Sequence, residues 1–411
     1  MSLRSDAFEI IEYAIKSADP YRSVYEKLSS ADLGTAPLTV FSIGKAAIPM
    51  ARAASDVLGG RIKTGLAVTK YGHTGDFSSP YFTVIEAAHP VSDENSEKAA
   101  ETALAIADGL GAEDVCVVLL SGGGSALFEK SIIPAEKQRD ITEKLLARGA
   151  EIDEMNVIRR RLSEVKGGKF AARCYPAKVF TFALSDVLSN DRSVIASGIS
   201  VKDVTDEKTV RAAADKYLYD VEDNIKELLY INNDLKINDG GYYFVGDINS
   251  LCGAALDKAR ALGYDARIVS RSLTGEARER AAEILAAVPE EAGRRAYIYG
   301  GETTVTLKGK GLGGRNQEMA LAAAVTLRNR SGIFFASVGS DGTDGPTDAA
   351  GGYADGDSYA LMRSAGCVPE EYLDDNNSYH ALKKAGTLIV TGPTGTNVND
   401  LTFVLTEKSE E

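Results

Sequence analysis

Residues 114–125 of this chain read DVCVVLLSGGGS, in which an apolar run is followed at once by three glycines between two serines. A short, continuous apolar run that ends in a turn signal is typical of a strand buried on both faces. Such strands belong to parallel sheets, whose crossover helices cover the two faces. The segment therefore predicts a buried parallel strand over residues 114–120 that leads directly into a glycine-rich loop.

The alternation of strand and helix continues on both sides of this segment. Residues 38–43 (LTVFSI) form a second apolar run that ends at a glycine, and an amphipathic helical pattern follows it. We therefore expect an α/β fold of two α/β domains with largely parallel, Rossmann-like sheets. A polar, turn-rich stretch at residues 231–241 is the expected boundary, which gives domains of residues 1–232 and 233–411, and residues 242–245 form the first strand of the second domain.

The amino-acid composition disfavours some classes of binding partner, above all nucleic acids. The 411 residues include 59 acidic and 46 basic side chains, and the formal net charge of −13 disfavours nucleic acid as the main partner. No apolar run is long enough to span a membrane and the N-terminus has no apolar signal core, so we expect a cytoplasmic protein without membrane contact. Four scattered cysteines without a C-x-x-C pair are typical of free thiols. The oligomeric state stays open, and a homodimer is one compatible assembly.

The glycine-rich loop after the buried strand is a candidate phosphate site. Gly122, Gly123 and Gly124 have no side chains, so their backbone N–H groups can approach phosphate oxygens closely. Ser121 and Ser125 add two hydroxyl groups. The alternative is a flexible turn without a ligand. We favour phosphate binding, because ligands of open α/β sheets bind at the carboxyl ends of strands.

Two cations, Lys45 and Arg315, open predicted helices directly after glycines. The helix macrodipole favours anions at an N-terminus, so a bound anion would offset the unfavourable position of each cation. The alternative for each is a solvated surface side chain. Residues 309–314 before Arg315 also match G-x-G-x-x-G, but the preceding residues are hydrophilic and no acidic ribose ligand follows. We interpret this segment as a mobile or close-approach loop that delivers Arg315.

Aspartates also follow predicted strands. Asp186 and Asp191 come after a strand over residues 178–184, and Asp341 follows a later strand. Hard oxygen ligands at strand ends suit magnesium, which keeps several waters in phosphate-transfer sites. We expect these three side chains as candidate magnesium ligands, with helix capping or turn formation as the alternative. His89 follows a strand as well, and we expect it to be a structural hydrogen-bonding residue.

Taken in order, the motifs of this chain resemble those of the glycerate 2-kinase family with a C-terminal MOFRL domain. The resemblance extends over nearly the whole chain. The matching motifs are Gly44-Lys45-Ala46-Ala47, His89-Pro90-Val91, Leu120-Ser121-Gly122-Gly123-Gly124-Ser125-Ala126, Asn156-Val157-Ile158-Arg159 with Lys166-Gly167-Gly168, Ser185-Asp186-Val187, Val194-Ile195-Ala196-Ser197-Gly198, Gly300-Gly301-Glu302-Thr303-Thr304-Val305, Gly313-Gly314-Arg315-Asn316-Gln317-Glu318 and Gly342-Thr343-Asp344-Gly345-Pro346-Thr347-Asp348-Ala349-Ala350-Gly351. One departure is that Ile199 and Ser200 follow Gly198, where the family usually continues with Pro-Thr.

The resemblance implies a two-domain α/β enzyme with its active site in the cleft between the domains. It implies ATP-dependent phosphorylation of D-glycerate at the 2-hydroxyl group, which gives 2-phosphoglycerate. The essential lysine and arginine of the family fall on Lys45 and Arg315. We expect the loop of residues 122–124 to hold the phosphates of ATP and Mg²⁺ to bridge them. The two cations would stabilise the migrating phosphoryl group and orient the glycerate carboxylate, in an order that stays open.

Other functions stay open at this point. Some family members carry the name hydroxypyruvate reductase, which would make this an NAD(P)H-dependent enzyme, and the G-x-G-x-x-G segment is the only support for it in the sequence. A related sugar-acid kinase and a non-catalytic module that binds a sugar acid or nucleotide are two further alternatives. Phosphorylation at the 2- or the 3-hydroxyl group is also not decided by the sequence.

Overall fold

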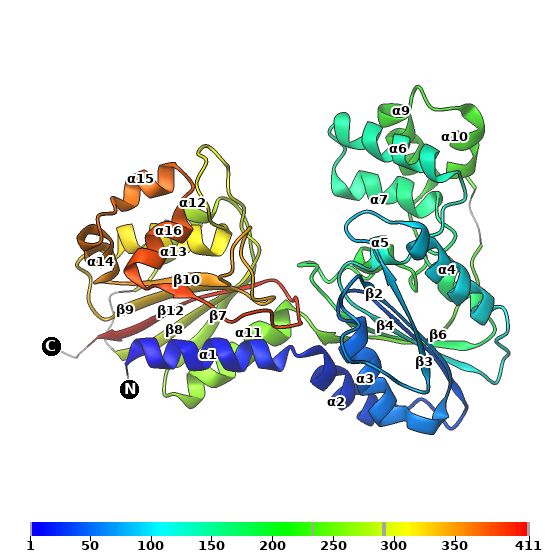
Figure 1. Ribbon diagram of the computed structural model, residues 1–411, viewed down its shortest axis with the longest axis horizontal. Helices are drawn as coiled ribbons and strands as arrows, with labels where there is room; N and C mark the ends of the chain where they lie inside the picture. Colours follow the sequence, from blue (N-terminus) through cyan, green and yellow to red (C-terminus); the bar gives the residue numbers. More distant parts are fainter. Residues whose placement is uncertain (1, 232–233, 290–292, 409–411) are drawn as a thin grey trace. The chain divides into compact units, whose positions relative to one another are not determined.

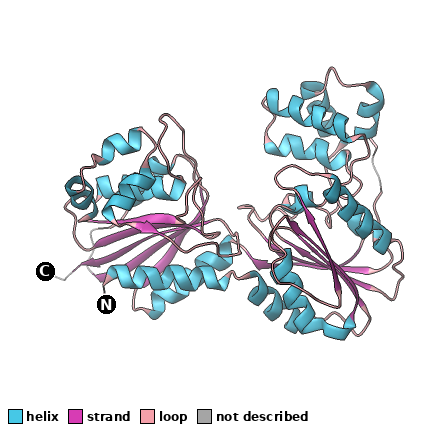
Figure 2. Cartoon of the chain, in the orientation of Figure 1, coloured by secondary structure: helices cyan, strands magenta, loops and turns pink. Residues whose placement is uncertain are grey.

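The computed structural model describes residues 2–231, 234–289 and 293–408, and the chain divides into two compact units. The glycine-loop unit contains Pro20–Leu184 and Asn190–Val245, and the Arg315 unit contains Met1–Asp19, Ser185–Ser189 and Gly246–Glu411. Each unit has one six-stranded sheet with helices packed on it (Figures 1 and 2). The predicted α/β class is therefore confirmed.

The sheet of the glycine-loop unit has the strand order β3-β2-β1-β4-β5-β6. The pairs β1–β2, β2–β3, β1–β4 and β4–β5 are all parallel, as predicted. β1 and β4 are buried over their full lengths, which explains their continuous apolar sequences. The strands are β1 (Leu38–Ile43), β2 (Ile62–Lys70), β3 (Phe82–Ala87), β4 (Val115–Leu120), β5 (Lys178–Leu184) and β6 (Asn238–Gly246).

This strand order reverses direction between β1 and β4. From β1 the chain moves outward to β2 and β3, and then returns to place β4 on the other side of β1. In doubly wound sheets, ligands bind outside the carboxyl ends of the strands at such a switch point. The last residues of the two strands, Ile43 and Leu120, are paired, so the loops that follow them start side by side.

Helices of the glycine-loop unit fall into two groups. α2 (Pro20–Ser30), α3 (Ala47–Leu58), η1 (Gly59–Arg61), α4 (Glu94–Ala107), α5 (Gly124–Leu127), α8 (Lys169–Arg173) and η2 (Ile195–Ser197) belong to the sheet-containing part of the unit. A second group, α6 (Ala135–Ala147), α7 (Ile152–Arg161), α9 (Glu207–Tyr217) and α10 (Asp223–Leu229), packs around an apolar core of its own (Figure 1). Leu145, Ile158 and Leu229 lie in that core.

The sheet of the Arg315 unit has the order β11-β10-β9-β12-β8-β7 and is mixed. Only β7 and β8 pair in parallel, whereas the last strand, β12, lies antiparallel between β8 and β9. The expectation of largely parallel sheets is therefore wrong for this unit, because a buried apolar run looks the same in either direction. The strands are β7 (Asp265–Leu273), β8 (Gly293–Gly301), β9 (Ile333–Gly339), β10 (Gly351–Asp355), β11 (Leu388–Ile389) and β12 (Asp400–Lys408).

Helices cover both faces of this mixed sheet. α1 (Leu3–Ser17) and α11 (Ile248–Ala261) pack together on one face (Figure 1). The other face carries α12 (Ala277–Ala286), α13 (Arg315–Thr326), α14 (Ser358–Ser364), α15 (Pro369–Asp374) and α16 (Ser378–Ala385). α13 is buried along most of its length, so its first residue has a well-defined position over the sheet.

The predicted boundary falls between residues 232 and 233, which lie outside the described residues, and the division into units differs from it in three places. Ser185–Ser189 is part of the Arg315 unit. α1 is part of the Arg315 unit, where Asp6 accepts hydrogen bonds from Tyr264 (2.7 Å) and Arg294. The strand predicted to open the second domain is β6, and it pairs at the edge of the first sheet. An amphipathic helix or an edge strand carries no local signal of the sheet on which it docks, so the sequence could not place these segments.

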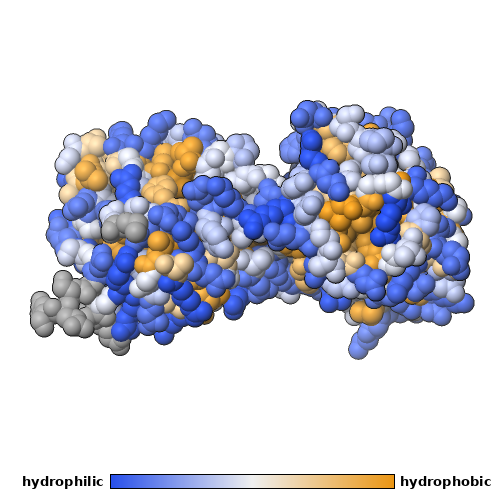
Figure 3. All heavy atoms as spheres, turned by 90° about the horizontal axis from the view of Figure 1, so that it is seen from below, coloured by the Kyte–Doolittle hydropathy of each residue, from blue (hydrophilic) through white to orange (hydrophobic). Residues whose placement is uncertain are grey.

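The surface is mixed in polarity. Apolar residues on the face shown in Figure 3 form separate areas bordered by hydrophilic residues. Within residues 2–231, 234–289 and 293–408, no helix combines the length and the apolar character needed to cross a bilayer.

We predict that Asp6→Asn destabilises the Arg315 unit. Asp6 is 1% exposed and holds both Tyr264 and Arg294, so loss of its charge should cost about 1–3 kcal/mol. Thermal unfolding should show a lower midpoint. Glu12→Gln on the same helix is the matched control, because among the described residues Glu12 pairs only with exposed Lys16, and it should leave the midpoint unchanged. An equal midpoint in the two variants would contradict this role of Asp6.

Candidate functional site

The two loops at the switch point are joined by backbone hydrogen bonds. Ser121 N–H donates to the carbonyl of Ile43 (3.0 Å), and Lys45 N–H donates to the carbonyl of Gly122 (2.9 Å). Ser121 Oγ accepts from the N–H of Ala46 (3.0 Å), the residue before α3. Ser121 is buried and serves to hold the loops together, so its hydroxyl group has a structural partner.

Gly44 makes this close approach possible. Its φ is +129°, and a Cβ there would lie 2.2 Å from Ser121 Oγ and 2.5 Å from Ser121 O. Both the backbone conformation and the available space therefore require glycine. The next residue, Lys45, is brought over the loop of residues 122–124 as a direct result.

Lys45 and His89 both lie beside Gly123. A Cβ on Gly123, whose φ is +85°, would be 3.1 Å from Lys45 Cγ and 3.1 Å from His89 Cδ2. The Lys45 side chain is exposed and makes no hydrogen bond or ion pair with any described residue. β1, β3 and β4 thus each deliver one part of a small polar site.

His89 differs from its predicted role. Within the described part of the chain its imidazole makes no side-chain hydrogen bond, so the expectation of a structural hydrogen-bonding residue is wrong. Burial lowers the pKa of His89, and the charges of Lys45 and Lys70 lower it further. The imidazole is therefore neutral at pH 7. The position of the histidine in a loop after a strand was the available signal that it lines the site.

The backbone amides of the glycine loop are free. The N–H groups of Gly122, Gly123, Gly124 and Ser125 donate to no group within the described residues. The first N–H groups of a helix such as α5 have no intrahelical partners, and consecutive free donors form concave anion-binding sites. Gly122, Gly123 and Ser125 are partly exposed, so a ligand can reach them. Four free donors beside an unpaired lysine form a site suited to phosphate oxygens.

A strained turn supports this loop from behind. A Cβ on Gly124 would lie 2.9 Å from Ala196 Cβ, and Ser125 Oγ lies 2.9 Å from Ser197 Oγ. Ala196 and Ser197 have φ values of +49° and +55°, which L-residues rarely adopt. The Ala196-Ser197-Gly198 motif therefore holds the glycine loop in shape.

The helix that begins at Arg315 has a different N-terminus. Asp344, which is 4% exposed, accepts hydrogen bonds from the backbone N–H groups of Asn316 (3.1 Å) and Gln317 (2.8 Å). This carboxylate already supplies the negative charge that the macrodipole favours. The idea that a bound anion must offset Arg315 at the helix end is therefore wrong. Burial also raises the pKa of Asp344.

Two carboxylates hold the Arg315 side chain. Arg315 Nε and Nη2 donate to Asp400 Oδ2 (2.5 Å) and Oδ1 (3.1 Å), and Nη1 lies 2.7 Å from Glu302 Oε1. Burial raises the pKa of Asp400 to about 6, although Arg315 opposes this change. The sequence reasoning missed both acidic residues. Their signal was the position of each at a strand terminus next to glycines or turn residues.

The glycine loop before Arg315 is packed rather than open. Gly309 and Gly311 lie against the backbone of Asp375, where a Cβ on either would come within 2.5 Å of it. The N–H groups of residues 308–312 all donate to acceptors in residues 375–377. These amides are unavailable to a dinucleotide. The close-approach interpretation of this loop is confirmed.

The three predicted magnesium ligands are divided between the two units. Asp186 and Asp341 belong to the Arg315 unit, and Asp191 belongs to the glycine-loop unit. Asp191 and Asp341 each accept a hydrogen bond from the backbone N–H two residues further on, as turn formers do. Across the ranges that the structure describes, no three His, Cys, Asp or Glu side chains are arranged to hold a metal ion.

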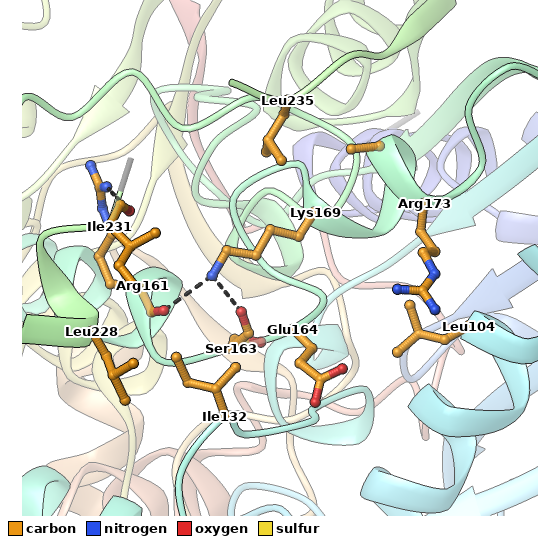
Figure 4. Close-up of a pocket in the computed structure, with 11 residues that line it drawn as sticks. Leu104, Ile132, Arg161, Ser163, Glu164, Lys169, Arg173, Leu228, Ile231 and Leu235 are labelled. Atoms are coloured by element: carbon orange, nitrogen blue, oxygen red, sulfur yellow. Dashed lines mark hydrogen bonds between the residues drawn. The ribbon is translucent and has the colours of Figure 1, made fainter. Parts of the chain in front are cut away.

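Two hollows, one in each unit, are lined by none of these residues. One, of about 370 Å³ in the glycine-loop unit, is lined by three cationic side chains, by Ser163 and Glu164, and by apolar side chains (Figure 4). Lys169 Nζ donates to backbone carbonyls, among them that of Arg161 (3.0 Å), so its charge already has internal partners. This pocket contains none of the predicted site residues.

Comparison with known proteins places the chain in a family. A model described as "Domain of unknown function (DUF4147)" matches residues 6–230, and the MOFRL family model matches residues 295–400. The chain is 42% identical to the D-glycerate 2-kinase of Thermotoga maritima, over 97% of each chain. The chain belongs to the glycerate 2-kinase family.

Solved structures and other relatives agree with this membership. The crystal structure of glycerate kinase from Thermotoga maritima matches with a TM-score of 0.93 and 40% identity, and covers 98% of this chain and 99% of that one. A relative from Agrobacterium vitis, provisionally named a hydroxypyruvate reductase, is 37% identical over 98% of this chain and 95% of its own. The resemblance to glycerate 2-kinases with a MOFRL domain is confirmed.

We predict that Gly44→Ala disrupts the junction of the two loops. The new Cβ would overlap Ser121, and the positive φ would be strained, so the cost should be about 2–5 kcal/mol. Denaturant unfolding measures it. Gly60→Ala in the same unit is the matched control, because a Cβ on Gly60 meets no atom within 4 Å. A Gly44→Ala protein as stable as this control would disprove the close contact.

A second prediction concerns the proximity of Lys45 and His89. Lys45→Ala removes one of the two cations that lower the pKa of His89, so the pKa should rise while the effect of burial persists. Proton NMR of the imidazole during a pH titration measures this, and the chain has only three histidines to assign. An unchanged pKa would show that the ammonium group lies farther from His89 than this geometry requires.

Proposed function

We propose that this protein phosphorylates D-glycerate at its 2-hydroxyl group, with Mg·ATP as the phosphoryl donor. The observation that carries the proposal is the row of four amides at residues 122–125 beside the side chain of Lys45, none of which has a partner within the described part of the chain. The 42% identity to a D-glycerate 2-kinase supports the choice of substrate. The four cysteines are free and buried, in keeping with action in a reducing cytoplasm.

The proposed mechanism is direct phosphoryl transfer. Such transfer requires positioning and charge stabilisation more than covalent chemistry. The free amides of residues 122–125 would bind phosphate oxygens of ATP, and Lys45 would stabilise charge on the migrating phosphoryl group. His89, neutral at pH 7, adds no competing positive charge beside Lys45. Mg²⁺ would arrive bound to ATP, with Asp186, Asp191 and Asp341 as candidate ligands or as partners of its waters.

Arg315 is proposed to bind the carboxylate of glycerate or the transferred phosphoryl group. Its planar guanidinium suits two-point recognition of either anion. Asp400 occupies Nε and Nη2, whereas Nη1 faces Glu302, whose side chain is 45% exposed. The Nη1 edge is therefore the one at which an anionic substrate would compete for Arg315.

The described loops give no support to the dinucleotide site that a reductase would need. A dinucleotide fold has G-x-G-x-x-G after its first strand and an acidic residue after the second. Here β1 is followed by Gly44-Lys45-Ala46-Ala47, and β2 ends at Lys70. The only G-x-G-x-x-G segment has its amides bonded to residues 375–377. A related sugar-acid kinase would share the same phosphate site and differ only in the acceptor.

Two assays on the purified protein test this function. Incubation with ATP, magnesium and D-glycerate should release ADP, whereas NADH with hydroxypyruvate should show no oxidation of NADH. Phosphorus NMR of the product should show 2-phosphoglycerate. A 3-phosphoglycerate signal would overturn the position of transfer and keep the kinase class. NADH loss without ADP release would make the protein a reductase, and neither activity would leave only a binding module.

We predict that Lys45→Ala lowers kcat by about 100–1,000-fold, as loss of one preorganised electrostatic group does in other enzymes. The melting temperature should stay unchanged, because Lys45 is exposed and bonds to no described side chain. Lys63→Ala is the control and should retain wild-type kcat. Lys63 is exposed and lies near the start of β2, whereas Lys45 follows the carboxyl end of the neighbouring parallel strand β1. A Lys45→Ala enzyme with near-wild-type kcat would reduce Lys45 to a solvated surface lysine.

Arg315 needs a different substitution. Arg315→Ala leaves the buried Asp400 without its partner and should lower both stability and kcat. Arg315→Lys keeps the charge but cannot reproduce the two-point contact, so it should recover only part of the activity. Steady-state kinetics of both variants, alongside their melting temperatures, separate the two effects. Full activity in Arg315→Ala would remove Arg315 from the mechanism.

A further inference from the structure

Asp400 holds Arg315 by a contact that differs from the one made by Glu302. It accepts from Nε and Nη2 at once, so the plane of the guanidinium is set by two bonds, whereas Glu302 touches only Nη1. The Asp400 side chain is 7% exposed and that of Glu302 is 45% exposed. One carboxylate is therefore buried and held at two points. The other is partly exposed and, besides Arg315, has only a long hydrogen bond from Asn399 Nδ2 (3.5 Å) among the described residues.

The backbone of Asp400 is equally well fixed. It is the first residue of β12, and it pairs with Gly301 on β8 and with Gly339 on β9. A Cβ on Gly339 would lie 3.5 Å from Asp400 Oδ1, so the carboxylate lies directly against this neighbouring strand. Pairing on both sides therefore fixes the position of the Asp400 backbone.

Charge balance alone does not explain Asp400. Three acidic groups, Asp400, Glu302 and Asp344, influence the charge on Arg315. Glu302 alone would neutralise the guanidinium, and it would do so at less desolvation cost because it is exposed. Asp400 in addition fixes the orientation of the Arg315 guanidinium plane, so that Nη1 faces the partly exposed side chain of Glu302.

We propose that Asp400 is a positioning residue for the phosphoryl-transfer reaction and acts only through Arg315. It holds the guanidinium plane so that an anionic ligand can take the place of Glu302 at Nη1 while the other two nitrogens keep their partner. This proposal rests on the proposed role of Arg315. Partners that orient a functional group typically contribute 10–100-fold to its activity in the better-studied metal sites.

Kinetics of Asp400 variants test the proposal. Asp400→Asn keeps the shape but weakens the two-point contact, so kcat/KM for D-glycerate should fall 10–100-fold, and Asp400→Glu should recover part of the loss. Asp6→Asn is the matched control, since Asp6 is an equally buried carboxylate paired with an arginine of the same unit. It should lose stability while its kcat/KM stays within twofold of wild type. A parallel loss of kcat/KM in both variants would show a general effect of destabilisation and overturn the proposal.

A double variant shows whether the effect passes through Arg315. If it does, adding Asp400→Asn to Arg315→Ala should cause no further loss of kcat/KM, because groups that act as a unit are not additive. A further 10-fold loss would overturn the proposal. The two claims fail separately. Wild-type activity in Arg315→Ala refutes the role of Arg315 itself, whereas an impaired Arg315→Ala beside a fully active Asp400→Asn refutes only the role of Asp400.

NMR of the wild-type protein tests the same point without an Asp400 variant. The Arg315 Nε–Hε signal, assigned by its disappearance in Arg315→Lys, should exchange slowly with water and persist when D-glycerate is added. Exchange as fast as that of an exposed arginine, or loss of protection on addition of glycerate, would show that Asp400 does not hold the fork during binding.

Discussion

The contact between the backbones of Gly44 and Ser121 is the constraint on which the phosphate site depends. Parallel pairing of β1 with β4 places Ile43 beside Leu120, so the two following loops must separate within one residue or pack against each other. A glycine at 44 allows them to pack, at a distance that any side chain would block. The packing turns Lys45 over the glycine loop and leaves the loop amides without partners.

The two glycine-rich loops of the chain show opposite uses of the same residue. At residues 122–125 the backbone donors have no partner among the described residues and lie beside a cation, an arrangement that favours a bound anion. At residues 309–314 the glycines permit close packing, and the donors are used within the protein. Free amides, rather than glycine content, therefore distinguish a ligand loop from a packing loop.

Sequence patterns predicted the parts of the molecule that depend on residues close together in the chain. The buried strands β1 and β4, the glycine loop between strand and helix, and Lys45 and Arg315 beside helix starts all follow from residues that are neighbours in the chain. The mixed second sheet, the docking of α1 and the partners of Arg315 did not, because each depends on pairing between distant segments. Asp400 and Glu302 are 98 residues apart by numbering, and only the antiparallel pairing of β12 with β8 brings them to one arginine.

A crystal structure of the protein with Mg²⁺ and a non-hydrolysable ATP analogue is the most direct test of this account. The account predicts phosphate oxygens within hydrogen-bond distance of the N–H groups of residues 122–125 and an ionic contact to Lys45 Nζ. Phosphates bound elsewhere on the protein, with those N–H groups and Lys45 still unpartnered, would contradict it.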